Sequence, residues 1–202
     1  MSFWIADHPL VLASGSATRH RLLAAAGLVF ERATPDVDER ALEDETPDRS
    51  PTGVATALAR AKALDVSARK PRALVIGADQ VLSLDGRLFH KSHDRAGALA
   101  TLVHLAGRTH RLTCAFALAC SGEIVAEGTD AADMTMRALE KVALGLYLDA
   151  AGEVALGSVG AYQWEGLGAH LFERVEGDHS TILGLPMLKL LAALRRLGAL
   201  SF

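Results

Sequence analysis

Two serines and an arginine stand at a corner of the chain where they could hold an anion. The stretch LASGSATRHRLL begins at Leu12; its apolar start predicts a strand and its end predicts a helix. Ser14, Ser16 and Arg19 lie where one passes into the other. The start of a helix offers unpaired backbone N–H groups and a positive dipole end, and an arginine matches phosphate geometry. The corner is therefore a candidate phosphate cradle, although an ordinary helix cap with a solvated basic face would look the same.

An aspartate interrupts an otherwise apolar predicted strand. Asp79 lies in the run VIGADQVL, where a charged carboxylate is costly unless it is paired, hydrogen-bonded or bound to a metal. Gly77, two residues earlier, indicates that something approaches the backbone closely at this point. We interpret Asp79 as a functional carboxylate; the alternative is a structural aspartate that is hydrogen-bonded at the end of its strand.

A short acidic run could supply a second carboxylate. Asp36, Asp38 and Glu39 follow one another closely in the sequence TPDVDE. Magnesium binds to proteins through one or two carboxylates together with substrate phosphates. Glu39 and Asp79 would form such a pair if the fold brings them together, whereas the run taken alone could equally be a solvated loop.

Two lysines could neutralise phosphate charge. Lys62 lies at the border of the apolar stripe of a predicted helix, and Lys91 follows a predicted strand just before another helix begins. Either side chain could instead lay its methylene stem along apolar surface and keep its ammonium group in water. The two lysines are therefore candidates for phosphate binding only in combination with the other residues.

Several common catalytic and metal-binding patterns are absent from the sequence. The eight histidines show no ligand spacing, and there is neither an HExxH motif nor a Cys/His zinc cluster. No nucleophile elbow, Walker A motif or GxGxxG loop is present. Cys114 and Cys120 would share one face of a strand yet lie too far apart to bridge, so we expect reduced thiols.

The composition indicates one globular domain, which we place at residues 1–202. Half of the 202 residues are apolar, which is enough to build a core without further support. A net charge of −3 argues against nucleic-acid binding and against a polybasic membrane surface, and 5% aromatic residues argue against a stacking platform. No run has the length of a membrane span or the pattern of a secretory leader, so we expect a cytoplasmic protein.

Hydrophobic patterning predicts strands and helices that alternate without strict βα regularity. The predicted strands cover residues 9–13, 28–33, 74–84, 87–90, 112–120 and 124–136. The predicted helices cover residues 17–26, 52–68, 93–106, 139–148 and 184–197, and residues 34–51 read as a loop. The last of these helices opens at Gly184-Leu185-Pro186, and its expected inner stripe is Met187, Leu190, Leu191, Leu194 and Leu197. Ser16 is expected to cap the first helix, and Gly27 and Gly198 to end the first and the last. We expect an α/β fold with a mixed central sheet and flanking helices, in which two lobes share one long sheet around a cleft.

Five segments, taken together and in order, resemble the Maf family of nucleotide pyrophosphatases. The resemblance extends from about Leu10 to about Leu197, and the joint occurrence of the segments is far more specific than any one of them. The segments are LVLASGSATRHRLL, TPDVDE, ALARAKA, VIGADQVLSLDGRLFHK and SVGAYQWEGLGAHLFERVEGDHSTILGLP.

The resemblance implies a fold, a reaction and a cofactor. The fold would be elongated, α/β and Maf/Ham1-like, with a deep cleft. The reaction would be hydrolysis of a nucleoside triphosphate between its α and β phosphates, which yields a monophosphate and pyrophosphate. It would require a divalent metal cation, Mg²⁺ or Mn²⁺, and the protein would commonly form a homodimer.

The resemblance also assigns roles to residues. It makes Asp79 the proton acceptor, and it makes Glu39 and Asp79 the metal ligands. The other matched positions are two lysines on the phosphates, three residues of the triphosphate-binding loop and three residues that set base specificity: Lys62 and Lys91; Ser14, Ser16 and Arg19; and Thr18, Gln80 and Glu165.

Within the family, the sequence is more similar to the branch that acts on 7-methyl-GTP. Gln80 in GADQV and Glu165 in WEGLG are typical of that branch. A methylated guanine ring carries positive charge, and a carboxylate such as Glu165 would suit it and accept its N–H donors. The alternatives are a dTTP/UTP pyrophosphatase, a housecleaning enzyme for other modified nucleotides, and a nucleotide-binding regulator of cell division or septum formation.

Overall fold

The computed structural model describes residues 3–202 and divides them into two compact units. Unit 1 takes its residues from Met1–Gln80, Cys114–Asp130 and His179–Phe202, and unit 2 from Val81–Thr113 and Ala131–Asp178. The division agrees with the expectation of two lobes, whereas the cleft and the single domain over 1–202 stay predictions. In the described part of the chain, no helix is both long and apolar enough to cross a membrane.

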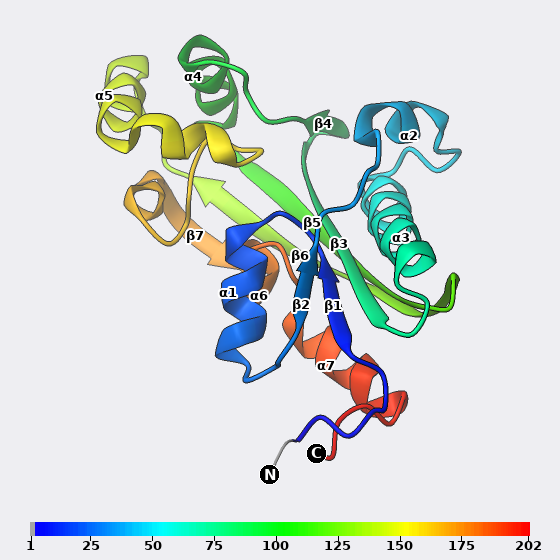
Figure 1. Cartoon of the computed structure of the whole chain (residues 1–202). Coiled ribbons are helices and arrows are strands. Elements are labelled where there is room, and N and C mark those ends of the chain that lie inside the picture. Colours follow the sequence, from blue (N-terminus) through cyan, green and yellow to red (C-terminus); the bar gives the residue numbers. More distant parts are fainter. Residues whose placement is uncertain (1–2) are drawn as a thin grey trace. The chain divides into compact units, whose positions relative to one another are not determined.

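The strands form one mixed sheet (Figure 1). Within residues 3–202 it contains β1 (Leu10–Ala13), β2 (Glu31–Ala33), β3 (Leu74–Leu84), β4 (Arg87–Phe89), β5 (Thr109–Cys120), β6 (Glu123–Met136) and β7 (Phe172–Glu176). The strand order is β2-β1-β3-β5-β6-β7, and β4 pairs with β3 off this path. Strand β1 runs parallel to β2 and β3, whereas the β3–β4 and β6–β7 pairs are antiparallel. The predicted mixed sheet is therefore confirmed.

The helices match most of the predicted ranges. The α-helices are α1 (Ala17–Ala25), α2 (Glu39–Glu45), α3 (Pro51–Arg69), α4 (Arg95–Leu105), α5 (Lys141–Ala151), α6 (His179–Ile182) and α7 (Met187–Arg196). Two 3₁₀ helices are η1 (Gly152–Gly157) and η2 (Leu167–Leu171). Ser16 caps α1 as predicted, because its side chain accepts a hydrogen bond from the Arg19 backbone. Gly27 and Gly198 follow α1 and α7 with positive φ, which is the backbone form that ends helices.

Unit 1 packs helices on both faces of β1 and β3, as Figure 1 shows for α1 and α3. Successive side chains of a strand point to opposite faces, so each strand supplies both layers of the core. The residues that pack with α1 and α7 include Leu10, Leu12, Leu74 and Ile76, and those that pack with α3 include Val11, Ala13 and Val75.

Three predictions about elements were wrong. The range 34–51 is not all loop: it contains α2, which Asp38 caps by accepting from the Ala41 backbone, and which buries none of its residues. The second strand begins at Glu31, because the Leu28 N–H still bonds to the Leu23 carbonyl to close α1. Leu197 is 42% exposed, because it lies at the cap of α7 and not on its inner face.

Strand β5 is buried on both faces from Leu112 to Ala119, as its continuous small and apolar side chains predict. Both cysteines on this strand are free thiols, in agreement with the expectation from their spacing. Burial raises the pKa of Cys114 to about 12, so this thiol is protonated at neutral pH.

Candidate functional site

Helix α3 approaches the backbone of β3 closely at Gly77. A Cβ atom added at this position would lie 2.2 Å from the Ala59 carbonyl oxygen and 2.6 Å from the Ala63 backbone nitrogen. Any larger residue would force the helix and the strand apart, which is the close approach that the glycine predicted. As a result, the residue before Ala63, Lys62, lies directly over this part of the strand.

Lys62 joins the two predicted carboxylates. Its Nζ atom lies 2.5 Å from Asp79 Oδ1 and 2.7 Å from Glu39 Oε1. The side chains of Lys62 and Asp79 are only 7% and 11% exposed, whereas that of Glu39 is 58% exposed. Lys62 therefore lies within the buried face of α3, and not at its border as the pattern predicted. The structure brings all three residues together around one ammonium group.

The pair of carboxylates fits part of the ligand shell of a hard divalent cation. Glu39 and Asp79 already converge on one positive charge, and carboxylate oxygens are the ligands that Mg²⁺ and Mn²⁺ prefer. In residues 3–202, however, no group of three or more His, Cys, Asp or Glu is arranged to hold a metal. Such a cation would need phosphate oxygens and water to complete its shell, which is how Mg²⁺ usually binds with nucleotides.

The corner after β1 forms a compact set of donors. Ser14 Oγ accepts hydrogen bonds from the Ser16 backbone and from Arg19 Nη1, each at 3.2 Å. Gly15, between the serines, has nothing within 4 Å of the place where a Cβ would stand, so the backbone there is open to an incoming group. Arg19 is further held by a 2.7 Å hydrogen bond from its Nε to the Gly184 carbonyl.

The strand register places this corner beside Asp79. Strands β1 and β3 are parallel neighbours, and Ala13 pairs with Gly77. Ser14 follows Ala13 directly, and Asp79 lies two residues beyond Gly77, so both stand past the same point of two adjacent strands. The corner thus lies at the carboxyl end of β1, a common location for ligand sites in α/β sheets, and Asp79 lies beside it within β3, which continues to Leu84.

Two of the three predicted base-specificity residues are also in unit 1. Thr18 Oγ1 accepts a hydrogen bond from Arg21 Nη2 at 3.3 Å on the exposed side of α1. Gln80 Nε2 donates to the carbonyls of Thr181 and Ile182, at 2.9 Å and 3.1 Å. These contacts identify the segment 179–184 as part of the site, which the sequence reasoning missed. The segment lies within the last of the five segments that carry the family resemblance, but we interpreted Gly184-Leu185-Pro186 only as the opening of the last helix.

The remaining two predicted site residues belong to unit 2. Lys91 lies between β4 and α4, and Glu165 precedes η2; both are exposed. Their roles at the phosphates and at the base stay predictions.

Comparison with known proteins gives the chain a family. A family model described as Maf-like protein matches residues 9–197. The chain belongs to the Maf-like protein family. The resemblance inferred from the sequence segments is therefore confirmed.

Two relatives of this Maf-like protein match nearly their whole length. A protein of Bradyrhizobium diazoefficiens named nucleoside triphosphate pyrophosphatase is 53% identical over 96% of both chains. A protein of Mesorhizobium japonicum named 7-methyl-GTP pyrophosphatase is 51% identical over 95% of this chain and 98% of its own. The solved structure of a nucleoside-triphosphatase, dITP/XTP pyrophosphatase, from Mycobacterium abscessus covers 95% of this chain with a TM-score of 0.43 and 16% identity.

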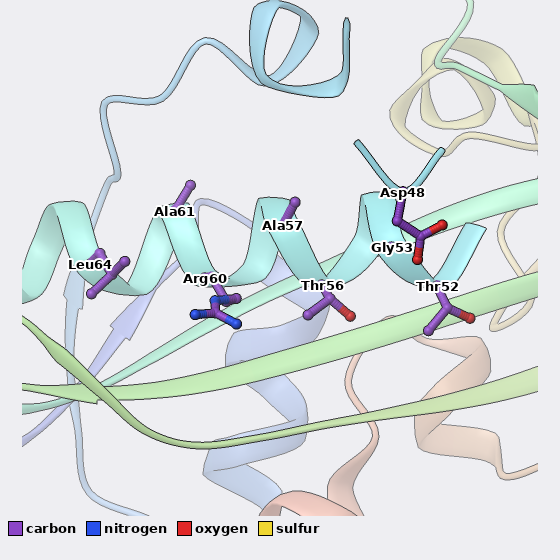
Figure 2. Close-up of a pocket in the computed structure, with 8 residues that line it drawn as sticks. All are labelled: Asp48, Thr52, Gly53, Thr56, Ala57, Arg60, Ala61 and Leu64. Carbon is purple, nitrogen blue, oxygen red and sulfur yellow. The ribbon is translucent and has the colours of Figure 1, made fainter. Parts of the chain in front are cut away.

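An open pocket of about 500 Å³ in this Maf-like protein lies elsewhere on α3 (Figure 2). None of its lining residues belongs to the predicted site, and Lys62 is not among them. The lining residues are Asp48, Thr52, Gly53, Thr56, Ala57, Arg60, Ala61 and Leu64. The candidate site is therefore defined by the contacts of Lys62, Asp79 and Arg19, and not by this pocket.

Proposed function

We propose that this Maf-like protein is a nucleoside triphosphate pyrophosphatase, which cleaves its substrate between the α and β phosphates. The observation that carries the proposal is the register of β1 and β3, which sets the Ser14–Arg19 corner beside the joined carboxylates of Asp79 and Glu39. An anion-binding corner next to a carboxylate pair is the arrangement that a polyphosphate hydrolase needs. The printed names of the full-length relatives support the same reaction.

Each residue of the site has a distinct task in this proposal. Ser14, Ser16 and Arg19 bind the polyphosphate tail through hydroxyl, backbone and guanidinium donors. Asp79 holds the attacking water and takes up its proton, and Lys62 keeps that carboxylate in place and offers its charge to the leaving pyrophosphate. Lys91 is a second candidate for that charge.

Glu39 and Asp79 would hold the Mg²⁺ or Mn²⁺ ion together with the substrate. A bound divalent cation supplies neutralisation of phosphate charge and polarisation of the phosphoryl group. Because Lys62 Nζ occupies the space between the two carboxylates, the ion and the ammonium group compete for the same oxygens. We therefore expect the cation to bind tightly only when a nucleotide supplies further ligands.

For the substrate we propose 7-methyl-GTP, with dTTP and UTP as the alternative. Relatives from Mesorhizobium japonicum and Rhizobium etli carry the name 7-methyl-GTP pyrophosphatase, at 51% and 50% identity. Glu165 is an exposed carboxylate that could pair with the cationic ring of a methylated guanine. Thr18 and Gln80 are the other two positions that the family resemblance assigns to base specificity.

The deciding experiment measures the products of hydrolysis over a small panel of nucleotides. 7-Methyl-GTP, GTP, dTTP and UTP are incubated with the protein and Mg²⁺ or Mn²⁺, and pyrophosphate and orthophosphate are quantified separately. We expect pyrophosphate and the monophosphate as products, the highest kcat/KM for 7-methyl-GTP, and loss of turnover with a chelator. Release of orthophosphate, or tight nucleotide binding without turnover, would contradict the proposal, and the latter would favour a regulator.

We also propose a homodimer in the cytoplasm, as the family resemblance implies. Light scattering coupled to size-exclusion chromatography gives the mass in solution directly. A mass of one chain of 21.3 kDa at micromolar concentration would contradict the dimer.

A further inference from the structure

Gln80 is one of the side chains that hold the segment 179–184 against the candidate site. Gln80 Nε2 donates to two successive backbone carbonyls, those of Thr181 and Ile182, at 2.9 Å and 3.1 Å. Only the nitrogen of the amide can donate, so the two carbonyls dictate which way the amide faces. Both N–H groups of Gln80 are thus committed to the chain itself, which leaves neither of them to read a nucleobase.

The same segment ends at the residue that holds Arg19. The Gly184 carbonyl accepts from Arg19 Nε at 2.7 Å, and Gly184 has φ +97, a conformation that favours glycine. A Cβ at Gly184 would lie 3.5 Å from Arg19 Nε and 3.7 Å from Gln80 Oε1. Arg19 and Gln80 therefore meet at one backbone position, although neither donates to the other in the hydrogen bonds described.

The far side of the segment is anchored independently. The Thr181 hydroxyl, which is fully buried, donates to Asp130 Oδ2 at 3.0 Å. Lys189 Nζ lies 2.8 Å from Asp130 Oδ1 and donates to the Thr129 carbonyl at 2.6 Å. The segment therefore contacts Asp130 of β6 on one side and Gln80 on the other, and both sets of hydrogen bonds determine its position.

We propose that Gln80 is a positioning residue for Arg19, acting through the segment 179–184. Its two hydrogen bonds set the place of the Gly184 carbonyl, and that carbonyl fixes the guanidinium group beside Ser14. Gln80 then governs affinity for the triphosphate, and it does not discriminate between bases through its amide N–H groups. The inference rests on the proposed function, since it concerns the same phosphate-binding corner.

A ligand without a base separates positioning from base reading. Inorganic tripolyphosphate carries the phosphates alone, and its affinity is measured by titration calorimetry on the whole protein without nucleotide. The variants are Gln80→Met, which keeps the length but removes both donors, Arg19→Ala, and the double variant. Gln163→Met is the matched control, because this exposed glutamine of unit 2 also donates its amide to a backbone carbonyl, that of Val154.

We expect Gln80→Met to weaken tripolyphosphate binding by about tenfold, because Arg19 would lose binding energy comparable to that of about one hydrogen bond. The loss should vanish in the Arg19→Ala background, because the two residues act on one contact. The ratio of kcat/KM for 7-methyl-GTP and GTP should stay the same in Gln80→Met, and Gln163→Met should change neither quantity.

The opposite pattern overturns the inference. Unchanged tripolyphosphate affinity in Gln80→Met, together with a changed ratio between 7-methyl-GTP and GTP, makes Gln80 a base-reading residue. If Gln80→Met does not fold, the variant Gly184→Ala replaces it, because it disturbs the same segment and leaves Gln80 intact. The inference then requires Gly184→Ala to weaken tripolyphosphate binding by about the same factor. A wild-type protein that does not bind tripolyphosphate would refute the phosphate-binding corner itself, and with it both this inference and that part of the proposed function.

Discussion

The ammonium nitrogen of Lys62 lies 2.5 Å from Oδ1 of Asp79, and both side chains are almost completely buried. The third member of the group, Glu39, is largely exposed, so the pair with Asp79 is the buried one. A buried charge is tolerated when its partner is present and becomes costly when the partner is removed. The relationship between these two residues therefore affects both stability and chemistry.

Replacement of Lys62 by methionine should destabilise the fold. Lys62→Met leaves the Asp79 carboxylate buried without its cation, at a cost of about 3–5 kcal/mol in the free energy of unfolding. The double variant with Asp79→Asn should recover most of that loss. Urea denaturation measures both effects.

The matched control for this prediction is Lys70→Met. Lys70 pairs with Glu31 at 2.7 Å, but both side chains are exposed, so the change should be below about 1 kcal/mol. Equal stabilities of the Lys62 and Lys70 variants would show that the buried pair is not coupled to folding.

Replacement of Asp79 by asparagine should abolish turnover, and the fold should survive because the Lys62 ammonium keeps its ion pair with Glu39. The amide oxygen can still accept from Lys62, but it cannot take up a proton from water, so pyrophosphate release should fall by at least about 10²-fold. The control Asp149→Asn removes an exposed carboxylate from its pair with Arg95 and should keep full activity. Full turnover in Asp79→Asn, with a normal melting curve, would remove this residue from the mechanism.

Replacement of Gly77 by alanine should separate α3 from β3. The new methyl group would overlap backbone atoms of Ala59 and Ala63, so we expect a loss of at least about 1–3 kcal/mol and lower activity. Gly145→Ala in α5 is the control: its Cβ would meet only Arg95 Nη2, at 3.7 Å, and a helical alanine should stabilise by up to about 1 kcal/mol. Similar unfolding midpoints for the two variants would disprove the tight contact at Gly77.

Protonation of a buried histidine should make the fold acid-sensitive. Burial lowers the pKa of His110 from 6.5 to about 4, although nearby Asp133 opposes the shift. His110 Nε2 lies 2.6 Å from the Tyr162 hydroxyl, and in the part of the chain described its Nδ1 has no hydrogen-bond partner. Between pH 6.5 and pH 4 the unfolded chain therefore binds a proton that the folded chain rejects, so stability falls as the pH is lowered through this range.

The variant His110→Gln tests that dependence. The full contribution is about 3 kcal/mol, since one pKa unit corresponds to 1.36 kcal/mol. Unfolding free energies at several pH values should decline less steeply for His110→Gln than for the wild type below pH 6.5. Only the difference in slope matters, because any lost packing shifts the variant equally at every pH. Parallel curves would mean that His110 does not carry the dependence.

Local patterning predicted most of the elements, and its failures have a common cause. The caps at Ser16 and Gly27 and the doubly buried run of β5 were readable because each depends on residues that are neighbours in sequence. Helix α2 was missed because it buries no residue and thus has no apolar stripe to detect. The start of β2 was misplaced because a single hydrogen bond of Leu28 back to α1 decided it.

By itself, the sequence determined the residue types of the site and the family, because ordered motifs carry that information along the chain. Only the tertiary structure decided how those residues meet. Asp79 and Glu39 share the Lys62 ammonium because α3 packs against Gly77, and Gln80 faces the segment 179–184 because that segment is tied to Asp130. Such contacts join residues far apart in the sequence and arise from packing, which no local periodicity encodes.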